Sequence, residues 1–400
     1  MSMKIAILSD MHIGYDRFRK DAFLQAKEAL EKACRMADAI IIPGDIFDAR
    51  FPKPDVIAEA IVLFRDAPVK EFGAEIIDFK GEKEIHTKKP ILAIPGTHER
   101  RTGDTEDPVD LLNLTSLLAN IGMGVAILGK GEERVAVTGI SGVAEERFRE
   151  ALEKHAASPV RGAFNILVFH QSIYELLPFN DSFLRIEELP KGYDLYVDGH
   201  IHNRVEKTVH GKPFLIPGST VLTQLKDGET GGKGFFVYDT ESGSAEFVKI
   251  NSRSFDVLKI ELSGVEKEAQ VVSDIEDGIS AVLGSKGKGS IIRIEIKGSG
   301  REIKKIEIGL QEVMKRHRDD AVIEISRKGA DEIRSSVDES AHSADFDSLS
   351  VSDKGMGILL SELGKSGYSM KMGPTELFDM LSSGEKKDKV IERILKELLS

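Results

Sequence analysis

The chain alternates short apolar runs with longer amphipathic segments from Met3 to about Asn251, a rhythm typical of a layered α/β domain. Most of the runs are apolar over four or five consecutive residues, so we expect strands that are buried on both faces. The predicted strands are Lys4–Ser9, Ile40–Pro43, Ile91–Pro95, Val135–Gly139, Ile166–Phe169, Leu195–Val197, Phe214–Ile216, Phe235–Tyr238 and Phe247–Ile250. Apolar residues at helical spacing predict helices at Asp21–Met36 and Asp55–Asp66, and a third that begins near Pro108 and carries leucines as far as Leu118.

A shorter unit with the same two kinds of element follows Asn251. Its predicted order is a strand at Phe255–Leu262, a helix around Glu268–Val282, a strand at Ile291–Ile296, a helix at Glu302–Arg316 and a strand at Ala321–Ile325. We therefore expect two α/β domains, at residues 1–250 and 251–330. Residues 331–353 are rich in Ser, Asp, Ala and Glu and have few large apolar side chains, which predicts a flexible linker.

Polar side chains that can bind metal ions follow five of the buried strands. The segments are Asp10-Met11-His12, Gly44-Asp45-Ile46-Phe47-Asp48, Gly96-Thr97-His98-Glu99, His170 and Asp198-Gly199-His200-Ile201-His202. Five of the ten histidines of the chain lie at these strand ends. The crevice beyond the carboxyl ends of strands is where ligands bind in open α/β sheets, so we expect these loops to converge on one site.

Each of these segments alone is more often structural, since a lone histidine such as His170 is usually a satisfied core residue. Together they favour a metal site, because several buried carboxylates and imidazoles would otherwise lose their hydration with nothing to offset the cost. Cys34 is the only cysteine, which excludes an internal disulfide and a thiolate cage and favours a reducing, cytoplasmic location. Imidazole and carboxylate ligands suit Mn, Fe or Zn rather than a closed structural zinc site.

The same set of donors indicates a reaction. One carboxylate can bridge two ions about 3.5–4 Å apart, an arrangement that activates water and stabilises both the attacking and the leaving oxygen in phosphoryl hydrolysis. Asp45 is our candidate for the bridge because it is central in chain order. His98 follows a turn and imidazole titrates near neutral pH, so we expect His98 to protonate the leaving oxygen.

The charge of the chain bears on its partners. With 67 acidic and 55 basic side chains the formal net charge is -12, which taken alone argues against nucleic acid. Basic residues nevertheless follow each predicted metal motif. They are Arg17, Arg19, Lys20, Arg50, Lys53, Arg100, Arg101, Arg204 and Lys207. Such runs are usually solvated surface, but their repeated placement favours a rim that faces phosphate groups. No stretch is apolar enough to span a bilayer, so we expect no membrane partner.

In their order along the chain, these motifs resemble those of the calcineurin-like metallophosphoesterases. A narrower resemblance is to the SbcD-type nucleases, the meiotic recombination eleven family of DNA double-strand-break repair. It rests on the segments Asp10-Met11-His12-Ile13-Gly14-Tyr15, Gly44-Asp45-Ile46-Phe47-Asp48, Ile216-Pro217-Gly218-Ser219-Thr220 and Lys233-Gly234-Phe235-Phe236. The resemblance implies an α/β sandwich of two central β-sheets flanked by helices, a small α/β capping domain that helps to orient duplex DNA, and a C-terminal helical tail.

Carried over position by position, the resemblance implies two divalent metal ions, with Mn the expected metal. One ion would be held by Asp10, His12, Asp45 and His202, and the other by Asp45, His170 and His200. His98 would be the catalytic histidine. Thr97 departs from the family pattern, which has Asn at this position, and a threonine hydroxyl is a poorer ligand than an amide oxygen. We therefore expect a weaker second site. Asp48 and Glu99 are expected to be hydrogen-bond partners of the histidines.

The resemblance also implies protein partners. Residues 354–400 would dock on the coiled-coil base of an SMC-like ABC ATPase of the SbcC or Rad-fifty type. The apolar stripe from Val390 to Leu399 suits a helix that fills a groove, although the same helix could pack on its own domain. Family members also form homodimers through helices of the phosphoesterase domain, for which Leu111–Leu118 is our candidate segment.

Three functions are compatible with the sequence. The first is a metal-dependent DNA nuclease that processes double-strand-break ends with the ATPase, a double-strand exonuclease and single-strand endonuclease by resemblance. The second is a general metallophosphoesterase on small phosphodiesters or phosphomonoesters, because one fold serves many substrates. The third is a catalytically weak scaffold subunit for the ATPase, in which Thr97 in place of Asn has removed the catalytic activity. The cap, the linker and the terminal helices favour the nuclease.

Overall fold

The computed structural model describes residues 2–328, apart from 69–72, 101–105, 157, 178–182, 226–228 and 263–266. The predicted linker at 331–353 and the predicted helical region at 354–400 lie outside the described residues. The chain forms two compact units. The first contains Met1–Val257, Val282–Ile292 and Asp319–Val322, and the second contains Leu258–Ala281, Arg293–Arg318 and the chain from Ile323 onward.

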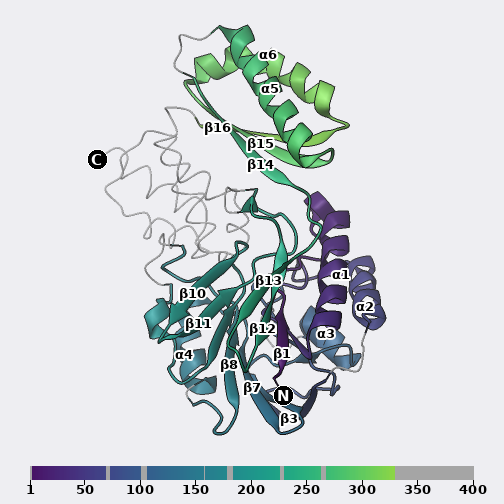
Figure 1. The fold of residues 1–400 in the computed structure, drawn as a ribbon, viewed down its shortest axis with the longest axis vertical. Coiled ribbons are helices and arrows are strands. Elements are labelled where there is room, and N and C mark those ends of the chain that lie inside the picture. Colours follow the sequence, from purple (N-terminus) through teal and green to yellow (C-terminus); the bar gives the residue numbers. More distant parts are fainter. Residues whose placement is uncertain are drawn as a thin grey trace, which may run out of the picture. The chain divides into compact units, whose positions relative to one another are not determined.

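A six-stranded sheet is built around the N-terminal strand (Figure 1). Its order is β13 (Ala245–Lys249), β12 (Gly234–Asp239), β1 (Lys4–Ile7), β2 (Ala39–Ile42), β4 (Ile91–Ala93) and β5 (Ala119–Asn120). β1, β2, β4 and β5 are parallel, with Ala6 opposite Ile40 and Ile41 opposite Leu92, whereas β12 is antiparallel to β1. Because parallel strands end at the same edge, the loops after β1, β2 and β4 start side by side.

A seven-stranded sheet forms the other half of the first unit. Its order is β10 (Val205–Val209), β11 (Lys212–Ile216), β9 (Leu195–Asp198), β8 (Phe164–Phe169), β7 (Glu133–Ile140), β6 (Gly124–Lys130) and β3 (Glu75–Gly81). β7, β8, β9 and β11 are parallel, and β10, β6 and β3 are antiparallel to their neighbours. His170 follows β8 directly, and the segment with His200 and His202 follows β9.

The two sheets pack face to face and helices cover their outer faces. Along β1, Ile5 and Ile7 belong to the core between the sheets, whereas Ala6 and Leu8 belong to the core under the helices. The first sheet is covered by α1 (Arg19–Met36), α2 (Pro54–Asp66) and α3 (Pro108–Leu114). The second is covered by α4 (Glu145–His155) through Phe148. The predicted sandwich of two sheets flanked by helices is confirmed.

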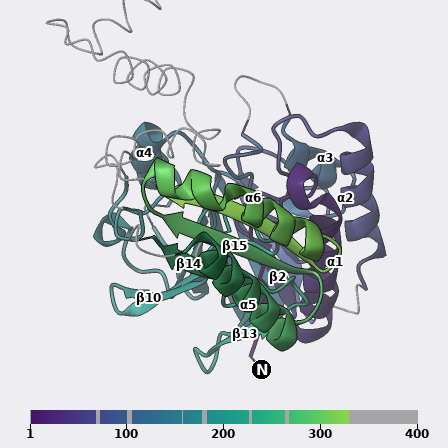
Figure 2. The ribbon, with the colours of Figure 1, turned by 90° about the horizontal axis from the view of Figure 1, so that it is seen from above.

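The second part of the chain has the predicted order of elements. They are β14 (Phe255–Glu261), α5 (Glu268–Lys286), β15 (Ser290–Lys297), α6 (Gly300–His317) and β16 (Ala321–Lys328). β15 is the middle strand, and α5 and α6 lie side by side across one face of this small sheet (Figure 2). A capping box starts α6, since Ser299 Oγ accepts from the Glu302 N–H and the Glu302 carboxylate accepts from the Ser299 N–H. No helix in the described residues is long and apolar enough to cross a membrane.

Within the described residues, the sequence pattern misses four strands (β3, β5, β6 and β10), one α-helix (α4) and two short 3-10 helices (Asp16–Phe18 and Ile186–Glu188). β3 and β10 are edge strands with mixed polar residues, β5 has two residues, and α4 buries only Phe148 and Leu152. The prediction that the third helix carries on to Leu118 is wrong. α3 ends at Leu114, because Thr115 Oγ1 donates back to the Leu111 carbonyl at 2.9 Å and Ser116 turns the chain with a φ of 59°.

Candidate metal centre

The predicted metal ligands lie together in two neighbouring clusters at the carboxyl ends of the strands. Donor atoms of Asp10, His12 and His202 lie within 4.8 Å of one another, and we call these residues the first cluster. Donor atoms of Asp45, His170 and His200 do the same, and we call these residues the second cluster. His170 Nε2 lies 3.1 Å from Asp45 Oδ2. The negative charge of Asp45 also acts on Asp10 and His12, so Asp45 lies near both clusters.

Four of these residues have a left-handed backbone. The φ angles are 50° at Asp10, 46° at His12, 52° at Asp45 and 67° at His200. For residues with a side chain this conformation costs about 1–2 kcal/mol each, and such strain collects at functional sites. Main-chain hydrogen bonds between neighbouring loops hold it, from Asp10 N to Gly44 O at 3.2 Å and from His12 N to Asp45 O at 3.1 Å. The loops are therefore fixed in the conformation that turns the donors toward each other.

Two glycines let the loops approach this closely. A Cβ atom at Gly44 would lie 2.3 Å from His170 Nδ1, and one at Gly96 would lie 2.2 Å from Asp45 Oδ1. Gly44 also has a φ of +93°. Any side chain at these positions would push His170 and Asp45 away from the second cluster, which explains why the motifs at residues 44–48 and 96–99 begin with glycine.

Asp48 and Glu99 support the site in different ways. As predicted, Asp48 contacts histidines, with its Oδ1 3.0 Å from His12 Nδ1 and its carbonyl oxygen 2.9 Å from His98 Nδ1. The prediction that Glu99 does so is wrong. Its carboxylate accepts from the N–H groups of Asp45 at 3.1 Å, Phe47 at 2.9 Å and Gly96 at 2.8 Å. Glu99 therefore ties the loop after β2 to the loop after β4.

The pKa of each cluster residue depends on its burial and on the charges of its neighbours. Burial raises the pKa of Asp10, and it lowers the pKa of His200 to about 3 and that of His202 well below its usual range. The pKa of His170 is instead raised, to about 10, because the contact with Asp45 outweighs the effect of burial. For Asp45, burial is outweighed by the nearby His170 and His98, which hold its pKa well below normal. His200 and His202 are thus uncharged and can offer lone pairs.

The donors fit divalent cations better than they fit one another. Asp10 Oδ1 is buried and has no hydrogen-bond partner. His12 Nε2 and His202 Nε2 face each other at 3.1 Å and both point at this carboxylate, which lies 3.9 Å from the first and 3.6 Å from the second. Buried groups of this kind are costly unless something satisfies them, and a divalent cation does so. Imidazole and carboxylate donors without thiolate suit Mn, Fe or Zn.

Thr97 faces the second cluster. Its hydroxyl oxygen lies 3.5 Å from Asp45 Oδ2, 3.5 Å from His170 Nε2 and 3.3 Å from His200 Nδ1. The hydroxyl therefore occupies the side of the cluster where a fourth ligand would stand. It is a neutral donor group with weak affinity for a cation, whereas the first cluster has three stronger donors.

His98 lies at the boundary between the clusters and solvent. Its side chain is 21% exposed, while those of the cluster residues Asp10, Asp45 and His170 are almost fully buried. The backbone N–H of His98 donates to Asp45 Oδ1 at 2.9 Å, and its ring centroid lies 4.9 Å from that of His12. The imidazole is therefore fixed beside the metal donors and remains open to a substrate.

The predicted basic rim is only partly available. Arg17, Lys20, Arg50, Lys53 and Arg204 are exposed, Arg100 is half-buried, and Arg101 lies outside the described residues. Burial and the nearby charge of Arg50 lower the pKa of Arg100, so these two arginines lie close together. Arg19 instead binds Asp55 at 2.6 Å and Glu59 at 3.0 Å, which joins α1 to α2. Arg204 lies over the Phe247 ring at 4.6 Å.

Sequence reasoning missed a polar network behind His202. Thr223, Glu229 and Lys233 are all buried, and Thr223 Oγ1 lies 2.5 Å from His202 Nδ1. None of the three lies directly at the end of a predicted strand, since Thr223 comes seven residues after Ile216, so the strand-end rule could not find them. The one signal in the sequence is a lysine directly before the apolar strand β12, in a segment already notable for its family resemblance.

This geometry agrees with the result of comparison with known families. Calcineurin-like phosphoesterase is the family that matches, over residues 3–204. The chain belongs to the calcineurin-like phosphoesterase family, and it is a metallophosphoesterase that hydrolyses phosphoesters.

More particular relatives are proteins named for DNA double-strand break repair. Mre11 of Methanopyrus kandleri is 24% identical over 333 residues, which cover 76% of this chain and 67% of that protein. Mre11 of Archaeoglobus fulgidus is 26% identical over 341 residues, covering 74% and 69%. MRE11 of Oryza sativa is 27% identical over 306 residues, covering 63% and 43%. The chain thus matches about two thirds of the archaeal proteins and less than half of the plant protein.

Proposed function

We propose that this protein is a metal-dependent DNA nuclease that processes double-strand-break ends together with an SMC-like ABC ATPase. The observation that carries the proposal is the pair of donor clusters with Asp45 near both, in a chain similar to DNA double-strand break repair proteins. Two clusters of this kind are what hydrolysis of a phosphodiester with two ions requires.

In this proposal each cluster holds one divalent ion, with Mn the expected metal. Asp10, His12 and His202 would hold the first ion, and Asp45, which lies near both clusters, would contribute to both sites. His170 and His200 complete the second site with Thr97 beside them. The bound ions supply Lewis-acid stabilisation of negative charge on the phosphate oxygens. The protein supplies the positions, because Glu99 and the strained loops hold the donors before any ligand arrives.

His98 is the proposed proton donor. Its Nδ1 lies 2.9 Å from the carbonyl oxygen of Asp48, which can only accept, so Nδ1 carries a hydrogen in any state. Nε2 is then the nitrogen that gains and loses the transferred proton. The partial exposure of the ring lets Nε2 reach the leaving oxygen of a phosphodiester, as general acid catalysis needs.

DNA contacts are proposed for the exposed basic residues that follow the metal motifs. Arg50 and Arg100 are the strongest candidates, because they lie close together and follow Asp48 and Glu99, which contact the site. Arg17, Lys20 and Lys53 are further candidates. Arg19 and Arg204 are weaker candidates, because Arg19 binds Asp55 and Glu59 on the neighbouring helix and Arg204 pairs with Glu206 at 3.7 Å. Such contacts fix the DNA backbone in register without reading its sequence.

Two protein partners belong to the proposal. We propose that residues 354–400 dock on the ATPase, so truncation after Lys354 should abolish co-purification with it, and an unchanged complex would refute the docking. A homodimer through Leu111–Leu118 is restricted by the structure. Leu112, Leu117 and Leu118 are buried, whereas Leu114 is 54% exposed. Leu114 is therefore the side chain of that segment best placed to meet a second copy.

One experiment separates the proposed function from its alternatives. The purified chain is incubated with Mn²⁺, with and without chelator, on linear duplex DNA and on a simple aryl phosphodiester, beside Asp45→Ala and His98→Ala variants. We expect chelator-sensitive DNA cleavage that both substitutions abolish. Hydrolysis of the small ester alone would indicate a general phosphoesterase. Metal binding without either activity would indicate a scaffold subunit, and DNA cleavage that survives both substitutions would refute the site.

A further inference from the structure

Three buried polar residues connect to His202 from behind the first cluster. Thr223 follows β11, Lys233 directly precedes β12, and Glu229 lies between them in the chain. Their exposures are 7% for Thr223, 3% for Glu229 and 4% for Lys233. Lysine and glutamate are almost never this buried unless they are paired, and here they form an ion pair with Lys233 Nζ 2.5 Å from Glu229 Oε1.

The hydrogen bonds of this network have a defined direction. The Glu229 carboxylate can only accept, and it lies 3.5 Å from Thr223 Oγ1. It also accepts the N–H groups of Thr223 at 3.2 Å, Gln224 at 2.9 Å and Leu225 at 2.6 Å. When the Thr223 hydroxyl donates toward Glu229, it can accept from His202 Nδ1, 2.5 Å away. This assigns the ring hydrogen of His202 to Nδ1.

The consequence for the metal site is a fixed lone pair. With its hydrogen on Nδ1, a neutral His202 has its lone pair on Nε2, the atom that faces Asp10 Oδ1 at 3.6 Å. The main chain of His202 is held as well. Its carbonyl oxygen accepts from Lys233 Nζ at 3.0 Å and from the Ser219 N–H at 3.2 Å, and Lys233 Nζ also donates to Ser219 Oγ at 2.8 Å.

Stability alone does not account for this arrangement. A buried ion pair adds little to folding stability, because the cost of removing both charges from water offsets their attraction. Both charged groups in this pair reach the same histidine, Glu229 through Thr223 and Lys233 through the carbonyl oxygen. Partners of this kind behind a ligand fix its tautomer and orientation, and removing them typically weakens metal binding about 10- to 100-fold.

We propose that Glu229 and Lys233 are positioning residues for metal binding at the first cluster, and that they act on His202 through Thr223 and the His202 carbonyl. The inference rests on the proposed function, since it assumes that the first cluster binds a divalent ion. It adds that the affinity of this site depends on a hydroxyl and an ion pair that make no contact with the ion.

The test compares two buried threonines in the full chain. Thr223→Val removes the hydroxyl that contacts His202. Thr220→Val makes the same change at Thr220, which is fully buried and whose hydroxyl has no hydrogen-bond partner in the described part of the chain. Calorimetric titration of metal-free protein with Mn²⁺ should show the tighter site weakened about 10- to 100-fold by Thr223→Val. Thr220→Val should leave that affinity unchanged, and Thr223→Ser, which keeps the hydroxyl, should restore it.

A second readout reports the tautomer. In metal-free protein, the ring ¹⁵N shifts of His202 should show hydrogen on Nδ1 in the wild type and in Thr223→Ser, and a mixture of tautomers in Thr223→Val. The Glu229→Gln/Lys233→Met double variant removes both charges together, so it avoids an unpaired buried charge while still losing the clamp on His202. We expect it to fold and to bind Mn²⁺ more weakly than the wild type.

The outcomes are distinct. No Mn²⁺ binding by the wild type would overturn the proposed function and this inference with it. Binding by the wild type that Thr223→Val leaves unchanged, with the same His202 tautomer, would overturn the inference alone. Equal weakening by Thr220→Val and Thr223→Val would also overturn it, because it would show a general effect of changing the loop.

Discussion

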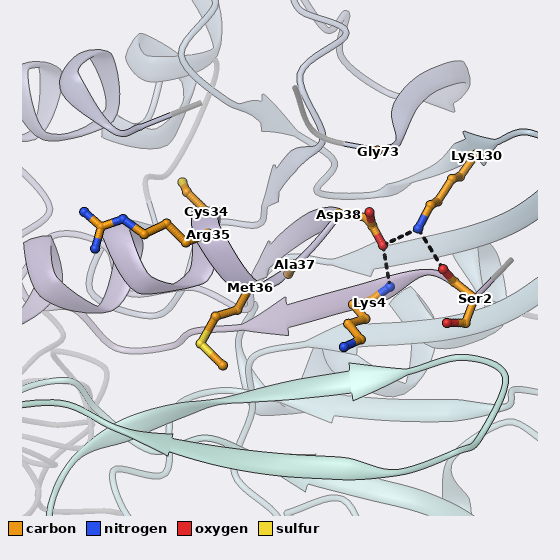
Figure 3. A pocket seen from close by; sticks show the side chains of 9 residues that line it. All are labelled: Ser2, Lys4, Cys34, Arg35, Met36, Ala37, Asp38, Gly73 and Lys130. Atoms are coloured by element: carbon orange, nitrogen blue, oxygen red, sulfur yellow. Dashed lines mark hydrogen bonds and ion pairs between the residues drawn. The ribbon is translucent and has the colours of Figure 1, made fainter. Parts of the chain in front are cut away.

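The polar groups at the two ends of the parallel strands differ in whether they have hydrogen-bond partners. At the amino ends of β1 and β2 lies a hollow lined by Ser2, Lys4, Cys34, Arg35, Met36, Ala37, Asp38, Gly73 and Lys130 (Figure 3). Lys130 Nζ binds Asp38 Oδ2 at 2.7 Å and the Ser2 carbonyl oxygen at 2.8 Å, and Asp38 Oδ2 also accepts the Lys4 N–H at 2.8 Å. Polar groups there satisfy one another.

At the carboxyl ends some of the polar groups are left unsatisfied. Asp10 Oδ1 has no hydrogen-bond partner, the Nε2 atoms of His12 and His202 face each other, and four residues adopt a left-handed backbone. Strained backbone and unsatisfied buried groups lower the stability of a fold, and they persist where they serve a function. Here that function is the binding of a divalent cation. In the hollow at the other end, none of the described lining side chains has a buried polar atom without a hydrogen-bond partner. Burial raises the pKa of the Cys34 thiol in this lining to about 11, which disfavours the reactive thiolate.

The largest expected difference in hydrolysis rate is between two aspartate variants, one at each end of the strands. Asp45→Ala should lower Mn²⁺-dependent hydrolysis at least about 1000-fold, because metal stabilisation of phosphate charge is worth several kcal/mol. Asp38→Ala should change the rate less than about twofold, because Asp38 contacts only groups at the amino end. Initial rates on an aryl phosphodiester measure both. Similar losses in the two variants would remove the contrast between the ends.

His98→Ala should have the next largest effect. Losing a general acid lowers kcat about 100- to 10,000-fold, while Mn²⁺ affinity should stay close to that of the wild type. Turnover and calorimetric titration on the same preparation separate the two quantities. A parallel fall in Mn²⁺ affinity would show that His98 is a ligand and not a proton donor.

Thr97→Asn tests the difference in metal affinity between the first and the second cluster. An amide oxygen is a better ligand than a hydroxyl, so the weaker Mn²⁺ site should tighten about tenfold, or about 1.4 kcal/mol. Thr97→Val is the matched control, because it keeps the shape of threonine and removes its oxygen, and it should not tighten the site. Unchanged or weaker binding in Thr97→Asn would show that another ligand already completes the second cluster.

The smallest effect is expected from Lys130→Met at the amino end. The side chains of Lys130 and Asp38 are 23% and 19% exposed, so the loss of their contacts should cost about 1 kcal/mol of unfolding free energy. Urea denaturation measures this cost. Mn²⁺ affinity and hydrolysis should not change, and a loss of either would mean that the amino end belongs to the functional site.

A feature of this structure could be predicted from the sequence when the residues that define it are close together in the chain. Asp10, Asp45 and His98 could be found because each lies within three residues after a run of apolar residues, and the pattern of a strand depends only on neighbouring residues. The partners of Glu99 could not be found, because its carboxylate binds main-chain N–H groups 52 and 54 positions away.

Several of the remaining misses also depend on residues that are distant in the chain. Edge strands such as β10 lack an apolar run because one side faces solvent, so their pairing is set by a neighbour and not by their own pattern. Thr223 and Lys233 reach His202 across 21 and 31 positions of chain. A buried lysine in sequence looks like a surface lysine until the fold supplies its partners.

The most direct test of the metal centre is a calorimetric Mn²⁺ titration of three metal-free proteins: the wild type, Asp10→Ala and Asp45→Ala. We predict two unequal sites in the wild type, loss of the tighter one in Asp10→Ala, and loss of both in Asp45→Ala, because Asp45 lies near both clusters. Wild-type Mn²⁺ binding in Asp45→Ala would contradict the account.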